Sequence, residues 1–268
     1  MVEMKKVRAI VLRSPGTNCD VESAHALELA GAVVERVHVN RLVEGGASLD
    51  DYQILFVPGG FSFGDDLGSG KIFANKLSFQ LEEKLKKFVE GGNLVIGPCN
   101  GFQVLVKSRL LPGFDVIDGE NFATLTFNDS GRFEGRWVAL KANRKSKCLW
   151  TKGIDWIELP CRHGEGKFVP KDKDVLARLK KNGQIVFQYC DSKGKTDVGY
   201  PLNPNGSVEG IAGICNSTGT VLGLMPHPEA FLYGFNHPRW TRQGKCAEAG
   251  AGRKIFENGV KYAEEKLV

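Results

Sequence analysis

The 268-residue sequence lacks the features that identify membrane-spanning and secreted proteins. No apolar stretch approaches the roughly 20 residues that a membrane-spanning helix needs, and the N-terminus runs into an apolar segment without the core of a signal peptide. A strong excess of either charge is also missing, since 36 basic residues face 31 acidic ones for a formal net charge of +5. We therefore expect neither a membrane nor a nucleic acid as a partner.

A recognisable cysteine framework is missing as well. The seven cysteines are an odd number, and no two of them form a C-x-x-C pair. That pattern fits neither a disulfide scaffold nor a zinc knuckle, so we expect no metal in this chain and a reducing, cytoplasmic location. With 42% hydrophobic residues, the chain is long enough to bury a core without such supports.

The first hundred residues contain an alternation of apolar runs and helical patterns. The runs predict buried strands at 7–12, 33–39, 54–57 and 94–96. One helix is expected to start near Asn18 or Asp20 and to end at Gly31. A second helix is predicted by one apolar face, which consists of Leu77, Leu81, Leu85 and Phe88. Continuous apolar strands joined by helices form parallel sheets that are covered on both faces.

The second half of the sequence changes to strands joined by turns. Strands are predicted at 123–127, 137–141, 154–159 and 185–189, and a hairpin at 211–214 and 221–225. A last helix has an apolar stripe formed by Phe256, Val260, Ala263 and Leu267. Because no repeat or linker interrupts the chain, we expect one α/β domain over residues 1–268. Its predicted architecture is a three-layer sandwich around a mostly parallel sheet, with extra antiparallel strands in the second half.

A cysteine stands in the segment Gly97-Pro98-Cys99-Asn100-Gly101, after a predicted buried strand and before a helical pattern. This Gly-x-nucleophile-x-Gly spacing is typical of a nucleophile elbow, a sharp turn that needs small residues on either side of the nucleophile. The start of the following helix favours the thiolate form of Cys99, and the next backbone N–H points to where an oxyanion would form. The alternative interpretation is that Cys99 is an ordinary buried small residue.

A histidine and a glutamate stand two residues apart in Pro226-His227-Pro228-Glu229. In an extended segment constrained by prolines, both side chains project to the same side. Glu229 can then hold the tautomer of His227 while the imidazole acts as a general base for a thiol. Taken alone, the segment is more typical of an ordinary loop histidine.

A glycine-rich turn, Pro58-Gly59-Gly60-Phe61-Ser62, follows the third predicted strand. Its glycines allow backbone N–H groups to approach a ligand, which favours an oxyanion-binding strand over a simple turn. The neighbouring segment 64–72 contains glycines and a lysine, as a phosphate-binding loop does. Its glycine spacing is wrong, however, and Ile72 replaces the required Ser or Thr. We therefore expect no nucleotide site in this chain.

In this chain order, the glycine-rich turn, the cysteine elbow and the late His-x-Glu resemble the class I glutamine amidotransferases. In detail the chain resembles the glutaminase subunits of phosphoribosylformylglycinamidine synthase. Six segments carry the resemblance, namely 15–20 (PGTNCD), 59–66 (GGFSFGDD), 99–103 (CNGFQ), 163–166 (HGEG), 203–207 (NPNGS) and 223–229 (GLMPHPE). The resemblance implies the class I amidotransferase fold and the hydrolysis of glutamine to glutamate and ammonia.

Applied to these positions, the resemblance implies a catalytic triad. Cys99 would form a glutamyl thioester, His227 would transfer protons, and Glu229 would orient His227. Thr17 and Asn18 are not included among the expected catalytic residues.

The resemblance also implies residues that hold the substrate. Backbone N–H groups near Gly60 and of Asn100 would bind the oxyanion, and Gln103 would help to position glutamine. His163 is left without an assigned role.

Partners are implied in the same way. In the family, ammonia passes to a separate synthetase subunit, which uses ATP and Mg to convert formylglycinamide ribonucleotide to formylglycinamidine ribonucleotide in purine biosynthesis. A small third subunit often bridges the two. Glutamine is then the ligand of this chain, and no cofactor is expected in it.

Two other functions are less well supported. Hydrolases and chaperones of the intracellular-protease-like superfamily often have a histidine directly after the cysteine, whereas Asn100 follows Cys99 here. A catalytically dead scaffold is disfavoured because all three triad positions are filled. Residues 230–268 extend beyond compact members of the family, and the resemblance assigns them no function, so a docking surface and an additional packing layer are both open. The six cysteines other than Cys99 are expected to lack a histidine partner.

Overall fold

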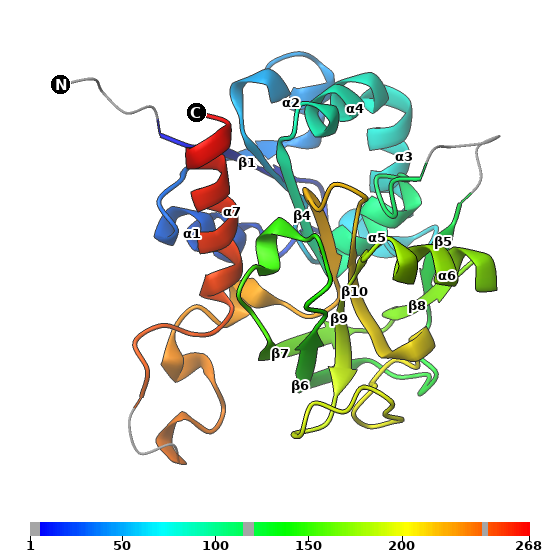
Figure 1. Cartoon of the computed structure of the whole chain (residues 1–268). Coiled ribbons are helices and arrows are strands. Elements are labelled where there is room, and N and C mark those ends of the chain that lie inside the picture. Colours follow the sequence, from blue (N-terminus) through cyan, green and yellow to red (C-terminus); the bar gives the residue numbers. More distant parts are fainter. Residues whose placement is uncertain (1–5, 115–120, 243–245) are drawn as a thin grey trace.

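The computed structural model describes residues 6–114, 121–242 and 246–268. Nine strands form one sheet in the order β2-β1-β3-β4-β11-β10-β9-β6-β7, and β5 pairs with β8 separately (Figure 1). The strands of the first half are β1 (Arg8–Arg13), β2 (Val33–His38), β3 (Ile54–Phe56) and β4 (Leu94–Pro98). Those of the second half are β5 (Ala123–Thr126), β6 (Glu134–Ala142), β7 (Trp156–His163), β8 (Lys167–Pro170), β9 (Ile185–Cys190), β10 (Ile211–Cys215) and β11 (Val221–Leu224).

One part of the nine-stranded sheet is parallel and the other part is antiparallel. β2, β1, β3, β4 and β11 pair in parallel. From β11 onward, β10, β9, β6 and β7 each pair with their neighbour in antiparallel fashion. The predicted fold class, with antiparallel strands added by the second half, is confirmed. Within the described ranges, no helix is long and apolar enough to cross a membrane.

Alternate residues of the central strands point to opposite faces of the sheet. In β1, Ile10 and Leu12 join one core, whereas Ala9 and Val11 join the other. The helices that cover the first core are α2 (Val39–Val43), α3 (Lys71–Gln80), α4 (Glu82–Glu90), α5 (Asn100–Lys107) and α6 (Lys173–Lys181). The second core is covered by α1 (Asp20–Leu29) and α7 (Arg253–Lys266), which lie against each other (Figure 1). The result is three layers.

Two helical predictions differ from the structure. The single helix expected over 77–88 is two helices, because the backbone leaves helical geometry at Leu81 (φ −131°, ψ 9°). All four residues of the predicted apolar face are nevertheless buried, since both helices pack on the same core. At the start of α1, Cys19 and not Asn18 or Asp20 is the N-cap, and it makes no side-chain capping bond.

The sequence pattern did not predict β8 and α6. Helix α6 buries only Val175 and Leu179 among charged residues, so its apolar face is narrow. Its start has a recognisable cap, because the carboxylate of Asp172 accepts a hydrogen bond from the N–H of Val175 over 2.8 Å. That cap is the local feature from which α6 can be identified.

Part of the segment after Glu229 is a packing layer. In α7, the ring of Phe256 stacks on Phe56 of β3 with their centroids 6.2 Å apart. Gly259 lies against Trp150 so closely that a Cβ there would be 2.3 Å from the indole ring. Of the two roles left open for residues 230–268, additional packing is therefore present in α7.

Replacing Phe256 by alanine should lower the free energy of unfolding by about 3–5 kcal/mol, because its side chain is fully buried between α7 and the sheet. Urea unfolding measures this change. The control Lys254→Ala, on the exposed side of the same helix, should change the free energy by less than about 0.5 kcal/mol. Two equally small effects would contradict the packing role of α7.

Candidate active site

Two neighbouring parallel strands carry the two halves of the candidate site. β4 and β11 pair with Pro98 opposite Leu224. Because parallel strands end at the same edge of a sheet, Cys99 after β4 and His227 after β11 come to the same edge. The N–H of Cys99 donates to the carbonyl of Leu224 over 2.8 Å, which ties the start of the turn to β11.

Cys99 occupies a sharp turn between β4 and α5. Its φ of 52° and ψ of −111° lie in a region that residues with a side chain rarely adopt. A side chain at Gly97 would come within 2.6 Å of Leu105, and one at Gly101 within 1.9 Å of the carbonyl oxygen of Val57. The close packing of β4, α5 and the end of β3 therefore requires both glycines, and it holds Cys99 in its strained conformation.

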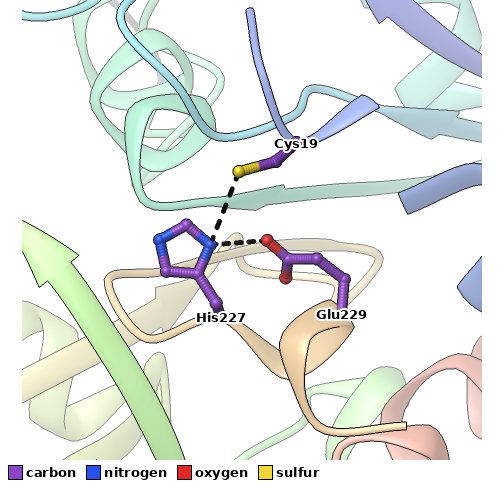
Figure 2. A group of neighbouring side chains, drawn as sticks. All are labelled: Cys19, His227 and Glu229. Carbon is purple, nitrogen blue, oxygen red and sulfur yellow. Dashed lines mark hydrogen bonds and ion pairs between the residues drawn. The ribbon is translucent and has the colours of Figure 1, made fainter. Parts of the chain in front are cut away.

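His227 and Glu229 form a buried pair (Figure 2). The Nδ1–H of His227 donates to Oε1 of Glu229 over 2.5 Å, and each residue is only 2% exposed. The backbone N–H of His227 donates to the carbonyl of Pro160 in β7, which fixes the segment against the sheet. Nε2 of His227 is buried without a hydrogen-bond partner among the described residues. The imidazole can therefore exchange a proton at Nε2 while Glu229 holds Nδ1.

A second cysteine lies beside this pair. Sγ of Cys19 is 4.0 Å from Nδ1 of His227, and Cys19 is only 4% exposed (Figure 2). The prediction that every cysteine except Cys99 lacks a histidine partner is therefore wrong for Cys19. The N–H groups of Asn18 and Cys19 donate to the carbonyl of Gly59 over 3.4 and 3.3 Å, and this contact brings the start of α1 to the site.

Gly59 lies next to the side chains of His227, Cys19 and Cys99. A Cβ at this position would lie 2.9 Å from Cε1 of His227, 3.2 Å from Sγ of Cys19 and 3.5 Å from Cβ of Cys99. The absence of a side chain here leaves both cysteines close to the imidazole. The thiol of Cys99 itself donates to the carbonyl of Arg162 over 3.5 Å.

The charges around His227 favour its protonated form. Burial lowers the pKa of the imidazole, but the negative charges of Glu229 and of a Cys99 thiolate outweigh burial and raise the pKa well above its usual value. Burial also raises the pKa of Cys19, so its thiol keeps its proton at neutral pH. The carboxylate of Glu229 can therefore hold His227 as an imidazolium.

A cavity of about 340 Å³ opens onto these side chains. It is lined by Asn18, Cys19, Glu22, Gly60, Phe61, Cys99, Phe133, Arg162 and His227. Three of the site residues expected from the sequence, Cys99, His227 and Gly60, thus line the same cavity. Glu229 is not a lining residue but is hydrogen-bonded to His227. Asn100 and Gln103 are not among the lining residues.

Several cavity residues were missed by the reasoning from sequence. Asn18 and Cys19 belong to the segment 15–20, which carries part of the resemblance, but the sequence does not indicate that they contact the site. No motif marks Glu22, Phe133 or Arg162. Their presence in the cavity depends on the sheet order, which a single sequence does not reveal.

Comparisons with known proteins give the family of the chain. Residues 6–263 match the CobB/CobQ-like glutamine amidotransferase domain. The chain is 48% identical over 262 residues to the phosphoribosylformylglycinamidine synthase subunit PurQ of Dehalococcoides mccartyi, which covers 98% of this chain and 100% of that protein. It is 44% identical over 267 residues to the subunit of the same name from Methanococcus maripaludis, with 95% and 97% covered. The structure of PurLQS from Thermotoga maritima is similar over 96% of this chain and 99% of the matched chain, with a TM-score of 0.72 and 32% identity.

This chain belongs to the PurQ subunit family of phosphoribosylformylglycinamidine synthase. The resemblance expected from the six sequence segments is therefore confirmed. The match to a glutamine amidotransferase domain over nearly the whole chain also confirms the predicted enzyme class.

In this PurQ-family chain, Asn100 and Gln103 hold the loop that follows the glycine-rich turn. The amide oxygen of Asn100 accepts from the N–H of Ser62 over 3.2 Å, and its amide nitrogen donates to Gln103 over 2.9 Å. Gln103 in turn donates to the carbonyl of Glu165 over 2.5 Å. These bonds connect the elbow to the loop beside Gly60. A direct contact between Gln103 and glutamine stays a prediction.

The segments 163–166 and 203–207 interlock next to this network. Asn205 donates to the carbonyl of Gly166 over 2.8 Å and to the hydroxyl of Tyr189 over 3.0 Å. The amide oxygen of Asn128 accepts from the N–H of Gly166 over 2.9 Å and lies 3.1 Å from Nδ1 of His163. Both segments thereby position the turn at Glu165, whose carbonyl accepts the hydrogen bond from Gln103. Burial is the main cause that lowers the pKa of His163 to about 4.

The buried, neutral His163 predicts a loss of stability at low pH. Its pKa in the folded chain is about 4 against an ordinary value of 6.5, so between these values the unfolded chain binds more protons. The free energy of unfolding should therefore fall by up to about 1.4 kcal/mol per pH unit as the pH drops through this range. Urea unfolding of His163→Gln should show a shallower dependence on pH than the wild type. Equal slopes in His163→Gln and in the wild type would contradict the prediction.

Proposed function

We propose that the chain hydrolyses glutamine through Cys99, His227 and Glu229 and passes the ammonia to a synthetase subunit. The observation that carries the proposal is the position of His227. Its Nδ1 is bound to Glu229 at 2.5 Å, and the charge of Cys99, which lines the same cavity, acts on the imidazole. This is the arrangement that thiol-based acyl transfer needs.

The reaction starts when the thiolate of Cys99 attacks the side-chain carbonyl carbon of glutamine. Backbone N–H groups of Asn100 and near Gly60 stabilise the negative charge on the carbonyl oxygen. His227 gives its proton to the leaving nitrogen, so that ammonia departs and a glutamyl thioester remains. The imidazole then takes a proton from water as the water oxygen attacks the thioester. Glutamate leaves, and the thiolate and imidazolium of the resting site are restored.

The charges of the cavity suit the amino-acid end of glutamine. Glu22 and Arg162 line the cavity together with Cys99. The carboxylate of Glu22 complements the α-ammonium group of glutamine, and the guanidinium of Arg162 complements its α-carboxylate. A ligand held at that end directs its side-chain amide toward the thiol, which supplies the orientation that the attack requires.

We infer that the partners are a synthetase subunit and a small bridging subunit. The support comes from the PurQ relatives and from the likeness to PurLQS of Thermotoga maritima. The partner would use ATP and Mg to convert formylglycinamide ribonucleotide to formylglycinamidine ribonucleotide. In this chain, Asp65 accepts hydrogen bonds from the N–H of Gly70 and from the hydroxyl of Ser69, each over 3.1 Å. The carboxylate of Asp65 thus accepts hydrogen bonds from this loop itself, which supports the assignment of ATP to the partner.

Two broader expectations also stay proposals. We infer a single domain over residues 1–268, because the nine-stranded sheet takes strands from both halves of the chain. We also infer a cytoplasmic location, which rests on the cysteine pattern of the sequence.

Cys99→Ala should abolish glutamine-dependent amidine synthesis by the assembled complex and leave ammonia-dependent synthesis intact. Only formation of the thioester needs the thiol, so the first rate should fall by several orders of magnitude. Both rates are measured on the same purified complex. The control Cys246→Ser replaces an exposed thiol and should change neither rate. Loss of both activities in a folded Cys99→Ala complex would show that Cys99 is structural.

A further inference from the structure

Cys19, His227 and Glu229 form a cluster with a chemical capacity beyond the proposed hydrolysis (Figure 2). One ligand atom from each residue, a thiol sulfur, an imidazole nitrogen and a carboxylate oxygen, lies within 4.8 Å of the other two. All three residues are at most 4% exposed. The proposed reaction uses His227 and Glu229 but gives Cys19 no role.

The carboxylate of this cluster has binding capacity that the fold does not use. Oε2 of Glu229 is buried without a hydrogen-bond partner among the described residues. A buried oxygen of this kind costs free energy unless a donor or a cation pairs with it. The thiol of Cys19 approaches Nδ1 of His227 only to 4.0 Å and donates weakly to Asn18 over 3.2 Å. The cluster can therefore bind an additional cation.

We propose that Cys19, His227 and Glu229 bind one Zn²⁺ ion and that the bound ion stops glutamine hydrolysis. The inhibition rests on the proposed function, whereas the binding does not. Zinc accepts sulfur, nitrogen and oxygen ligands in tetrahedral geometry, whereas Mg²⁺ and Ca²⁺ prefer oxygen ligands alone. The mixed donor set therefore selects a zinc-like ion. Such an ion is an inhibitor here and is not a cofactor of the reaction.

The observed separations are close to those of a zinc site. Zinc bonds of about 2.0–2.3 Å place neighbouring ligand atoms roughly 3.3–3.7 Å apart. Nδ1 of His227 is 2.5 Å from Oε1 of Glu229 and 4.0 Å from Sγ of Cys19, so these two separations differ from that range by less than about 1 Å. The third separation, between the ligand atoms of Cys19 and Glu229, is within 4.8 Å. Because Oε2 of Glu229 has no partner among the described residues, the carboxylate can rotate to make this adjustment. A water molecule from the cavity completes the tetrahedron.

Binding changes the protonation of two groups. The thiol of Cys19 releases its proton to solvent and coordinates as a thiolate. The imidazolium of His227 releases the Nδ1 proton and coordinates through that nitrogen. Its remaining proton stays on Nε2, so the ring can no longer take a proton from water there. Cys99 then loses its proton-transfer partner, and hydrolysis stops.

Cobalt titration of the full chain tests the site without glutamine. Co²⁺ replaces zinc in such sites, and a thiolate ligand gives it a charge-transfer band in the near ultraviolet. We expect one ion per chain, a thiolate band, and displacement of cobalt by Zn²⁺ but not by Mg²⁺. Cys19→Ser should remove the band and weaken zinc binding by more than the roughly 10- to 100-fold that loss of an outer-shell partner costs.

Three further variants decide between this site and others. Glu229→Gln, which keeps the size of the side chain, should keep the band but weaken zinc binding, and it tests the site even if Cys19→Ser does not fold. Cys246→Ser makes the same replacement at an exposed thiol and should change nothing. Cys99→Ala should keep the band as well. A band that survives Cys19→Ser in a folded protein, or that is lost in Cys246→Ser or Cys99→Ala, would overturn the proposal.

The inhibition is measured separately, as glutamine hydrolysis at rising Zn²⁺ relative to the zinc-free rate of the same protein. The wild type should lose activity and regain it with a chelator. The two proposals fail in distinguishable ways. If glutamine hydrolysis needs Cys99 but the cobalt band does not need Cys19, the zinc site alone is wrong. If the band needs Cys19 but hydrolysis survives Cys99→Ala, the proposed function alone is wrong.

Discussion

The parallel pairing of β4 with β11 determines where the reactive groups meet. It brings Cys99 and His227, which are far apart in the sequence, to one edge of the sheet, and the N–H of Cys99 is bonded to the last residue of β11. Other features of the site follow from this closeness. Gly101 lets α5 pack against the end of β3, and Gly59 leaves the space in which the side chains approach each other. A larger residue at either position would collide with backbone or with the imidazole.

Burial and charge act in opposite directions at His227. An isolated buried imidazole would lose its proton, yet the carboxylate of Glu229 and the charge of Cys99 raise its pKa. The ion pair of His227 and Glu229 is therefore buried, in an environment where charges interact strongly. The same proximity explains why Cys19, which also lies next to Gly59, is close to the imidazole. The groups that stabilise the charge of His227 therefore lie, together with Cys19, in an arrangement similar to that of metal ligands.

Much of the fold could be predicted because its central strands are buried on both faces and read as continuous apolar runs, as at 94–96. The elbow was predictable because its Gly-x-Cys-x-Gly spacing lies within one short segment between an apolar run and a helical pattern. The break at Leu81 and helix α6 with its narrow apolar face could not be predicted, because packing against the core decides both. The contact of Cys19 with His227 and the place of Arg162 in the cavity depend on the order of strands in the sheet. A single sequence does not contain that order.

The measurement that tests the central claim most directly is brief labelling with a glutamine-mimicking diazoketone, followed by peptide mass spectrometry. Cys99 and Cys19 both line the cavity, so the experiment asks which thiol reacts. We predict modification of Cys99, because Cys99 occupies the sharp turn before α5 that presents a nucleophile, whereas the raised pKa of Cys19 keeps that thiol protonated. Excess glutamine should prevent the modification. Labelling of Cys19 in place of Cys99, or labelling of Cys99 that glutamine does not affect, would contradict the account.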